Sequence, residues 1–451
     1  MVFLPLFLAN NSPIENQPPQ EIVQPQEVRP LPGRLNHIPV FNSNSPELVQ
    51  KEGILLSTFP PLGKRERSAH LDYLFVRRFD VFAHHVASAP NPEDLRTLYL
   101  GVLLHNPTRT PVTVNILQGA TYLSQPDAPF IELPPQVEDP LGTVYAGPGS
   151  RVMGEILRET RQEISGPELV IPPKESRMLL NLPIPVKDLE PPLNGRSAYF
   201  RLKTDGSLYA ASLAKFAPID ENTGEERPPT LEEWETLLVS GELVTPRDRP
   251  PSRPEDNQLI YGRVAGVSRG SVWYARLTNG QRYLTIPEVG QSLSYGLSTL
   301  EGGTFGTNQV QSAPLMVRYP DTAYESHGNY GVQYSVTIPL YNPTPQKQNV
   351  TISVQTPLKQ DSITDELRFL SPTPKSVFFR GTVRVGYIDE AATWQTRFFH
   401  LVQHRGQMGQ PLVHQTIPSQ RWRLVRLDFL YPPDATPPQV LTIRTDPSFE
   451  P

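Results

Sequence analysis

The segment with the most evident chemistry is Phe79-Asp80-Val-Phe-Ala-His84-His85, because imidazoles and a carboxylate are metal ligands. On a strand, His84 and His85 point to opposite faces. Asp80 and His84 share a face but lie roughly 13 Å apart at about 3.3 Å per residue. Asp80, His84 and His85 are therefore candidate metal ligands only if another loop completes a site around one histidine. The alternative is histidines that make structural hydrogen bonds at a strand end.

A second candidate is the loop Ser326-His327-Gly328-Asn329-Tyr330-Gly331, which opens a run of β-type residues. Its polar and aromatic groups would suit a binding surface, so His327, Asn329 and Tyr330 are candidate ligand-binding residues. The alternative is a tight loop in which Gly and Asn supply positive φ angles.

Aromatic residues gather in the stretch that follows Gly270. The flat rings of Trp273, Tyr274, Tyr283 and Tyr295 would form a platform for sugar rings. Trp273 and Tyr283 are therefore candidate ligand-binding residues. Aromatic side chains also dominate the interiors of β-proteins, so burial in a core is the alternative.

Gly266-Val-Ser268-Arg-Gly270 matches the G-x-S-x-G pattern of a nucleophile elbow. That elbow requires a strand before the serine and a helix after it. The following residues, Ser271–Leu277, have the composition of a strand, so a β-turn is favoured and no catalytic residue is assigned. The sequence also lacks a P-loop, a dinucleotide-binding fingerprint and an EF-hand loop, and we predict no cofactor.

Composition excludes several classes of protein and favours a mainly β fold. The net charge is −5, so no basic surplus indicates a nucleic-acid partner. The chain has no cysteine, which excludes disulfides and thiolate sites. It has 52 prolines in 451 residues, and proline is excluded from helix interiors and central strands. Short strands joined by rigid turns are the expected result.

One pattern occurs twice and predicts two related domains. Asn106-Pro107-Thr108 and Asn342-Pro343-Thr344 each lie between two runs of β-type residues. Further matches follow in the same order, Ile171-Pro172 with Ile417-Pro418 and Thr204-Asp205 with Thr445-Asp446. Proline fixes φ in a turn and the preceding asparagine bonds its own backbone, so both turns have a structural explanation. Each unit has the size of an immunoglobulin-type β-sandwich.

We therefore predict a mainly β protein of two related, immunoglobulin-like β-sandwich domains with few short helices. The expected divisions are an apolar start with a Pro/Gln-rich tether (1–38), a first β-domain (39–216), a charged Pro-rich linker (217–257) and a second β-domain (258–451).

Local patterns predict short helices at 45–53, 150–160 and 231–239, the last beginning with a capping box at Thr230-Leu-Glu-Glu233. Asn279-Gly280 predicts a hairpin turn, and residues 290–308 an exposed loop.

The first nine residues, Met1–Ala9, are apolar and too short to span a bilayer. They have the character of a signal-peptide h-region without a positive n-region, which favours a truncated or mis-started signal peptide over an apolar arm. No other segment approaches transmembrane length. We expect a secreted, periplasmic or cell-envelope location.

Several segments resemble an uncharacterised family of cyanobacterial proteins, a domain of unknown function. The resemblance rests on Pro39–Glu47, Glu52–Pro60, Phe79–His85, Gly262–Val267 and Ser326–Gly331, and it covers nearly the whole chain after the tether. It implies an exported protein and supplies no catalytic residue.

The leading hypothesis is a non-enzymatic exported or cell-envelope protein with a structural or ligand-binding role. Its expected partner is an envelope polysaccharide or another envelope protein. The alternative is a glycan-binding or glycan-hydrolysing β-sandwich protein. A hydrolase would place two carboxylates about 5–10 Å apart across a cleft.

Overall fold

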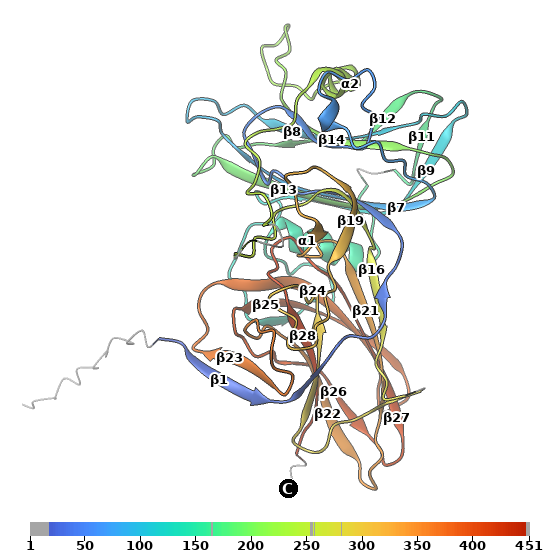
Figure 1. Ribbon diagram of the computed structural model, residues 1–451, viewed down its shortest axis with the longest axis vertical. Helices are drawn as coiled ribbons and strands as arrows, with labels where there is room; N and C mark the ends of the chain where they lie inside the picture. The colour runs from blue at the N-terminus through green and yellow to red at the C-terminus, as the bar shows by residue number, and fades with distance from the viewer. Residues whose placement is uncertain (1–17, 164–165, 253–255, 257, 281, 448–451) are drawn as a thin grey trace, which may run out of the picture.

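The computed structural model describes residues 18–163, 166–252, 256, 258–280 and 282–447. Strands account for 46% of the protein and helices for 5%, which confirms the mainly β prediction. Figure 1 shows two β bodies stacked along the long axis of the molecule, with helix α1 (Pro148–Leu157) between them. We call them the upper and the lower sandwich, after their places in that view.

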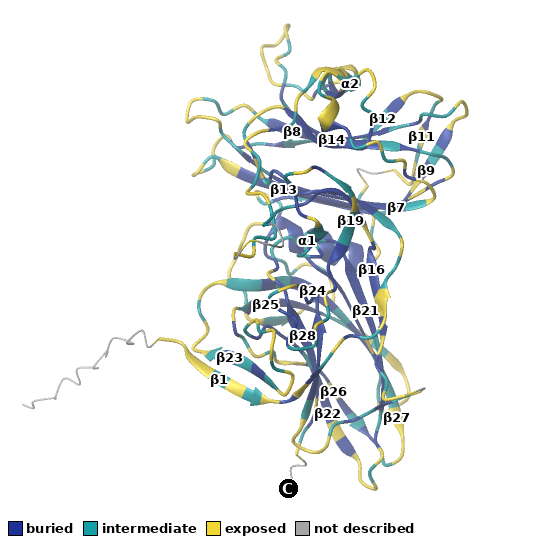
Figure 2. Ribbon diagram, in the orientation of Figure 1, coloured by how far each residue is buried: buried dark blue, intermediate teal, exposed yellow. Residues whose placement is uncertain are grey.

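The upper sandwich packs a nine-stranded sheet against a four-stranded one around a shared apolar core (Figure 2). In spatial order the larger sheet is β11 (Glu168–Ile171), β9 (Val112–Leu123), β13 (Leu193–Thr204), β7 (Arg78–Ser88), β4 (Pro39–Ser43), β15 (Ala265–Arg269), β19 (Ala313–Arg318) and β20 (Glu325–Ser326), with β5 (Leu48–Val49) beside β7. The smaller sheet is β12 (Ser176–Ile184), β8 (Leu98–His105), β14 (Tyr209–Phe216) and β6 (Gly53–Ser57). A 3-10 turn, η1 (Arg67–Ala69), follows β6.

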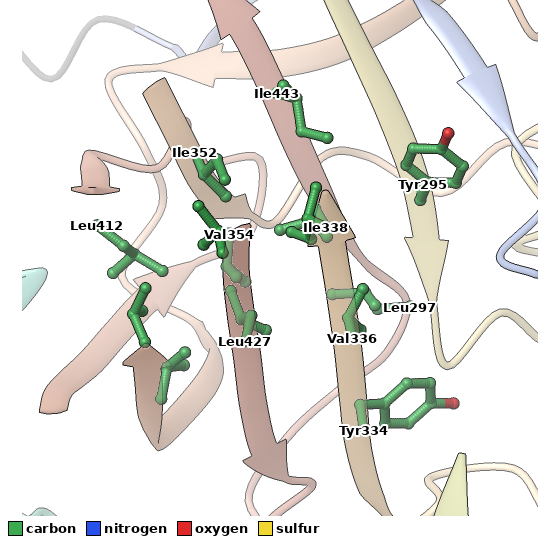
Figure 3. Packing of buried hydrophobic residues seen from close by; sticks show 14 of the residues in the cluster. Tyr295, Leu297, Tyr334, Val336, Ile338, Ile352, Val354, Leu412, Leu427 and Ile443 are labelled. Atoms are coloured by element: carbon green, nitrogen blue, oxygen red, sulfur yellow. The ribbon is translucent and has the colours of Figure 1, made fainter. Parts of the chain in front are cut away.

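The lower sandwich packs an eight-stranded sheet against a five-stranded one, and Figure 3 shows part of its core. The larger sheet is β10 (Gln136–Glu138), β25 (Trp394–His404), β24 (Val377–Ile388), β27 (Trp422–Leu430), β21 (Gln333–Tyr341), β16 (Val272–Arg276) and β3 (Arg34–Leu35), with β17 (Leu284–Thr285) beside β21. The smaller sheet is β2 (Glu27–Arg29), β18 (Ser292–Leu297), β28 (Gln439–Thr445), β22 (Gln348–Gln355) and β26 (Pro411–Ile417). A separate ribbon pairs β1 (Gln20–Pro25) with β23 (Glu366–Ser371).

The repeated sequence pattern corresponds to a repeated strand arrangement. The order β11-β9-β13-β7 in the upper sandwich matches β26-β22-β28-β18 in the lower one, and all of these pairs are antiparallel. Asn106 and Asn342 follow the equivalent strands β8 and β21. The sandwiches are thus related units, while their immunoglobulin-like form stays a prediction.

Chain segments cross between the two sandwiches. Strands β15, β19 and β20 come from the second half of the sequence but complete the sheet of the upper sandwich. In return, β2 and β3 pair with strands of the lower sandwich and β1 pairs with β23 in the separate ribbon, so the predicted tether forms paired strands from Gln20 onward. Residues 1–17, with the apolar start, lie outside the described residues. The division at 39–216 and 258–451 stays a prediction about independently folding units.

Two of the three predicted helices are present. Helix α1 buries Val152, Met153 and Ile156 against both sandwiches, including Leu430 of the lower one. Helix α2 (Leu231–Ser240) begins with the predicted capping box and buries Trp234 and Leu238.

The predicted helix at 45–53 is wrong. Leu48 and Val49 form β5, which pairs in parallel with β7. Asp248 accepts hydrogen bonds from the Ser45 hydroxyl at 2.6 Å and the Glu47 amide at 3.4 Å. These contacts and the pairing with β7 override the helix propensity of the local sequence.

Two loop predictions are also wrong. Strands β16 and β17 do not pair as a hairpin around Asn279-Gly280, because both lie parallel to β21 along its length. The predicted exposed loop at 290–308 contains β18, whose residues Leu293 to Leu297 are buried in the lower sandwich. Its small Ser and Gly residues suit close packing between strands.

Candidate functional site

A cavity of about 450 Å³ lies where the two sandwiches meet, and we call it the junction cavity. The upper sandwich supplies Asn42 and Asn44 at the end of β4, and the loop that joins β20 of the upper sandwich to β21 of the lower one supplies His327 and Tyr330. Residues 248–249 and 260–264, which connect the sandwiches, complete much of the wall. Segments that are distant in sequence therefore form one site.

The side-chain oxygens of two asparagines in this wall have no hydrogen-bond partner within the protein. Asn42 and Asn44 are each 2% exposed, and the Oδ1 atom of each has no partner. They are two residues apart and therefore lie on the same face of the chain. A buried amide oxygen without a partner costs about 1–3 kcal/mol, so a ligand that donates hydrogen bonds here would remove a penalty in the free protein.

Charged groups form a chain along the same wall. Arg263 lines the cavity and pairs with Glu47, and its Nε lies 3.6 Å from Asp248 Oδ1. Glu47 Oε1 lies 3.6 Å from His84 Nε2. Burial raises the pKa of Glu47, but the hydrogen bond with His84 and the charge of Arg263 together outweigh burial and hold that pKa below its usual value. These contacts fix the orientation of Arg263 at the cavity.

The predicted loop at 326–331 contributes two side chains to the cavity. Burial, followed by the nearby Lys359 charge, lowers the pKa of His327 to about 4, so its ring is neutral at pH 7. The His327 ring lies 4.8 Å from that of Tyr261, another cavity residue. Tyr330 donates its hydroxyl to the Ala435 carbonyl at 3.1 Å, and burial raises its pKa to about 12.

Asn329 does not line the cavity and has a structural role. Its Nδ2 donates to Ser298 Oγ, the Gln311 carbonyl and Tyr334 Oη, each at 3.1 Å, and its Oδ1 accepts from the Ala313 amide at 3.0 Å. Its φ of 49° is in the left-handed region that asparagine tolerates. The loop chemistry expected of Gly-Asn-Gly segments thus explains Asn329.

Nearly the whole chain matches one protein family. A family model described as "Protein of unknown function (DUF3370)" matches residues 26–445. The chain belongs to this family. No curated protein matches it.

Comparison with solved structures adds little. Lac15 from a marine microbial metagenome is 10% identical with a TM-score of 0.10, and the match covers 79% of this chain and 50% of Lac15. The 11S allergen from Cocos nucifera is 10% identical with a TM-score of 0.12, over 93% of this chain and 90% of the allergen. Pumpkin seed globulin is 10% identical with a TM-score of 0.09, over 89% and 86%. These scores support no functional argument.

The two predicted aromatic residues lie apart from the junction cavity and from each other. Trp273 is 6% exposed in the lower core, donates to the Pro32 carbonyl at 3.1 Å and stacks on Tyr334. Tyr283 instead lies at the surface, with its ring 5.8 Å from that of Tyr341 and 5.5 Å from that of Trp422. We call Tyr283, Tyr341 and Trp422 the aromatic cluster.

The metal candidates each bind protein groups. His84 Nδ1 contacts Ser197 Oγ at 2.8 Å, and His85 bonds Ser43 and the Pro46 carbonyl, both at 2.8 Å. Asp80 is fully buried and accepts from Arg78 and from the Tyr199 hydroxyl. Within the described ranges, no three His, Cys, Asp or Glu side chains are placed to hold one ion. The alternative of structural histidines fits this geometry.

Ser268 is not a nucleophile elbow. It is buried within strand β15, between β4 and β19, and the next element is the strand β16. The strand-then-helix context that would expose a nucleophile is therefore missing at this position.

Sequence reasoning missed most of the cavity wall. Asn42, Asn44, Arg263 and Lys359 were not singled out, although Asn42-Ser-Asn44 ends an apolar strand with two amides on one face. That spacing was the available signal.

Neither helix in the described part of the chain has the length and apolar character needed to span a membrane.

Proposed function

We propose that this protein is a non-enzymatic binding protein that holds a hydroxyl-rich ligand, such as a saccharide unit, in the junction cavity. The observation that carries the proposal is the pair of buried, unpartnered oxygens of Asn42 and Asn44 in its wall. Rotation of the two amides toward the cavity would let ligand hydroxyls donate to both oxygens, and this gain would be available only in the complex.

The size and lining of the cavity support this ligand class. A volume of about 450 Å³ falls in the range of about 300–1,000 Å³ that small-molecule sites occupy. Tyr261 and Tyr330 offer ring surface for the apolar faces of a sugar. Arg263 and Lys359 add donors for ring or glycosidic oxygens.

The arrangement favours binding over hydrolysis. Among the described residues, Asp248 is the single carboxylate in the cavity wall. It accepts from the Ser45 hydroxyl and pairs with Arg263, so it is committed to protein contacts. Glycoside cleavage uses two carboxylates flanking the bond, and this wall does not supply the second.

Export to the envelope or the exterior remains part of the proposal. It is supported by the apolar residues Met1–Ala9, which have h-region character. Fractionation of the host with N-terminal sequencing of the recovered protein tests it. Recovery from the cytosol with Met1 intact would contradict export.

The aromatic cluster favours a second candidate function, surface binding of a polysaccharide chain. Trp422 is 42% exposed, and Tyr283, Tyr341 and Trp422 come from or adjoin the neighbouring strands β17, β21 and β27. The exposed Trp422 ring beside the half-buried rings of Tyr283 and Tyr341 is suited to stacking against sugar rings.

Calorimetric titration with neutral mono- and oligosaccharides distinguishes the two sites. If the junction cavity binds the ligand, Asn44→Leu should weaken affinity at least 10-fold while Trp422→Ala leaves it unchanged. If the aromatic cluster binds it, the pattern reverses. Asn279→Leu, in an exposed loop, is the matched control for the asparagine change. If saccharides bind but neither variant weakens the binding, both assignments are refuted. Both are also refuted if none of the tested saccharides binds.

A further inference from the structure

A separate cavity of about 180 Å³ between the sandwiches is lined by four arginines. The upper sandwich supplies Arg78 and Arg201, at the ends of the neighbouring strands β7 and β13. The lower sandwich supplies Arg384 and Arg426, from β24 and β27. We call it the arginine cavity. Gln333 and Tyr274 add further polar groups to its wall.

The upper arginines share one buried carboxylate. Asp80 has no exposed surface, and its Oδ1 accepts from Arg78 at 3.1 Å while its Oδ2 lies 3.8 Å from Arg201 Nε. Tyr199 also donates to Asp80, at 3.0 Å. Arg201 donates to Gln333 and Gln118 through its terminal nitrogens, but its buried Nε has no hydrogen-bond partner.

The lower arginines also share one carboxylate. Asp428 is 2% exposed and contacts Arg384 at 3.3 Å and Arg426 at 3.1 Å. Ser335 donates its hydroxyl to Asp428 at 2.7 Å, so both acceptor oxygens are already engaged. Arg384 has a further partner in Glu159, whose side chain is 66% exposed.

The arrangement leaves cationic charge uncompensated. Four guanidinium groups face two buried carboxylates and one exposed carboxylate, in a chain whose net charge is −5. Guanidinium groups present planar pairs of donors that match the oxygens of phosphate, sulfate and carboxylate. Closely spaced cations repel one another, and a bound anion removes that repulsion.

We propose that the arginine cavity is an oxyanion-binding site, which takes a phosphate, sulfate or carboxylate group either as a free ion or as a substituent of a larger ligand. Its volume of about 180 Å³ fits a single such group. Tyr274 lines the cavity and is 58% exposed, so the rest of a substituted ligand would extend past this side chain to solvent. The site is independent of the proposed ligand of the junction cavity.

The test is calorimetric titration of the full chain at low ionic strength with sodium sulfate, sodium phosphate and sodium chloride. Arg426→Gln should weaken oxyanion affinity at least 10-fold. The side chain of Arg426 is 47% exposed, and Asp428 keeps Arg384 and Ser335 as partners, so the variant should fold. Arg444→Gln is the matched control, because Arg444 is 45% exposed and pairs with Asp446 on another sheet.

A second arm uses glucuronate and glucose 6-sulfate. Tighter binding of either sugar than of inorganic sulfate would identify a substituted ligand, whereas equal binding would identify the free ion. Arg384→Gln should reproduce the loss seen with Arg426→Gln. The proposal is overturned if no oxyanion binds saturably, if chloride binds equally well, or if Arg426→Gln and Arg444→Gln behave alike.

Discussion

Asn106 and Asn342 make the same set of hydrogen bonds in the two sandwiches. Asn106 Nδ2 donates to the carbonyls of Thr110, Ile171 and Pro172, and Asn342 Nδ2 donates to those of Gln346, Ile417 and Pro418. Each Oδ1 accepts from the backbone amide and hydroxyl of the threonine two residues later. In each repeat, the carbonyls of the Ile-Pro pair therefore accept hydrogen bonds from the asparagine of the Asn-Pro-Thr turn.

The first prediction concerns these two turns. Asn106→Ala and Asn342→Ala should each lower the free energy of unfolding by about 2–4 kcal/mol, because buried carbonyls lose their donors. The two losses should be similar, since the contacts are equivalent. Urea denaturation followed by circular dichroism measures them.

The control for the turns is Asn279→Ala in an exposed loop, which should change stability by less than about 0.5 kcal/mol. A large loss for one turn and none for the other would contradict the equivalence.

The second prediction separates stability from binding at Asn44. Replacing it with leucine removes an unpartnered buried amide of similar size, so the free protein should gain about 1 kcal/mol of stability. The same change should abolish the stabilisation that the saccharide ligand gives in thermal denaturation. If Asn44→Leu destabilises the ligand-free protein, the amide has a structural role in place of the proposed binding role.

Sequence predicted the features that depend on local chemistry. The turns at Asn106 and Asn342, the capping box at Thr230 and the helix around Val152 follow from residues within a few positions of each other. The failures depend on partners that are distant in the chain. Leu48 and Val49 became a strand because β7 was available to pair with them.

The same distinction applies to the sites. His327 and Tyr330 were noticed because they lie in one loop, but the junction cavity also needs Asn42, almost three hundred residues earlier. The arginine cavity was missed entirely, because Arg78, Arg201, Arg384 and Arg426 have no shared motif. They come together only because β7 pairs with β13, β24 pairs with β27, and the two sandwiches meet at this cavity.

The third prediction is pH dependence at His400. Burial lowers the pKa of this fully buried imidazole to about 4, from its usual value of about 6.5. The unfolded chain therefore takes up the proton first, and stability falls as pH decreases from about 6.5 to 4. The loss from this group amounts to about 3 kcal/mol below pH 4.

Comparison of variants isolates that contribution. His400→Gln should reduce the loss of stability between pH 6.5 and 4 by about 3 kcal/mol relative to the unaltered protein in urea denaturation. Profiles of identical slope for His400→Gln and the unaltered protein would disprove the assignment.

The fourth prediction tests the start of α2. Thr230 Oγ1 accepts from the Glu233 amide at 3.3 Å, and Glu233 Oε2 accepts from the Thr230 amide at 2.7 Å. Thr230→Ala should cost about 1 kcal/mol, since it removes one cap bond. Ser240→Ala, at the far end of the helix, should cost less; equal losses would show that the cap does not contribute.

The fifth prediction tests the N-terminal strands. Removal of residues 1–33 deletes β1 and β2 and the Pro32 carbonyl that accepts from Trp273 Nε1. The truncated protein should unfold at lower urea and show red-shifted tryptophan fluorescence. Unchanged stability and emission would indicate that this segment is a solvated tether after all.

The crossing of β15 and β19 into the upper sandwich has a consequence for synthesis on the ribosome. The sheet that contains Asp80 lacks three strands until β15 emerges, and it is complete only after Ser326. Until Arg269 has emerged, β4 presents an open edge, which is a template for pairing with other chains. Nascent chains stalled before that point should therefore be more prone to aggregation than chains that have passed it.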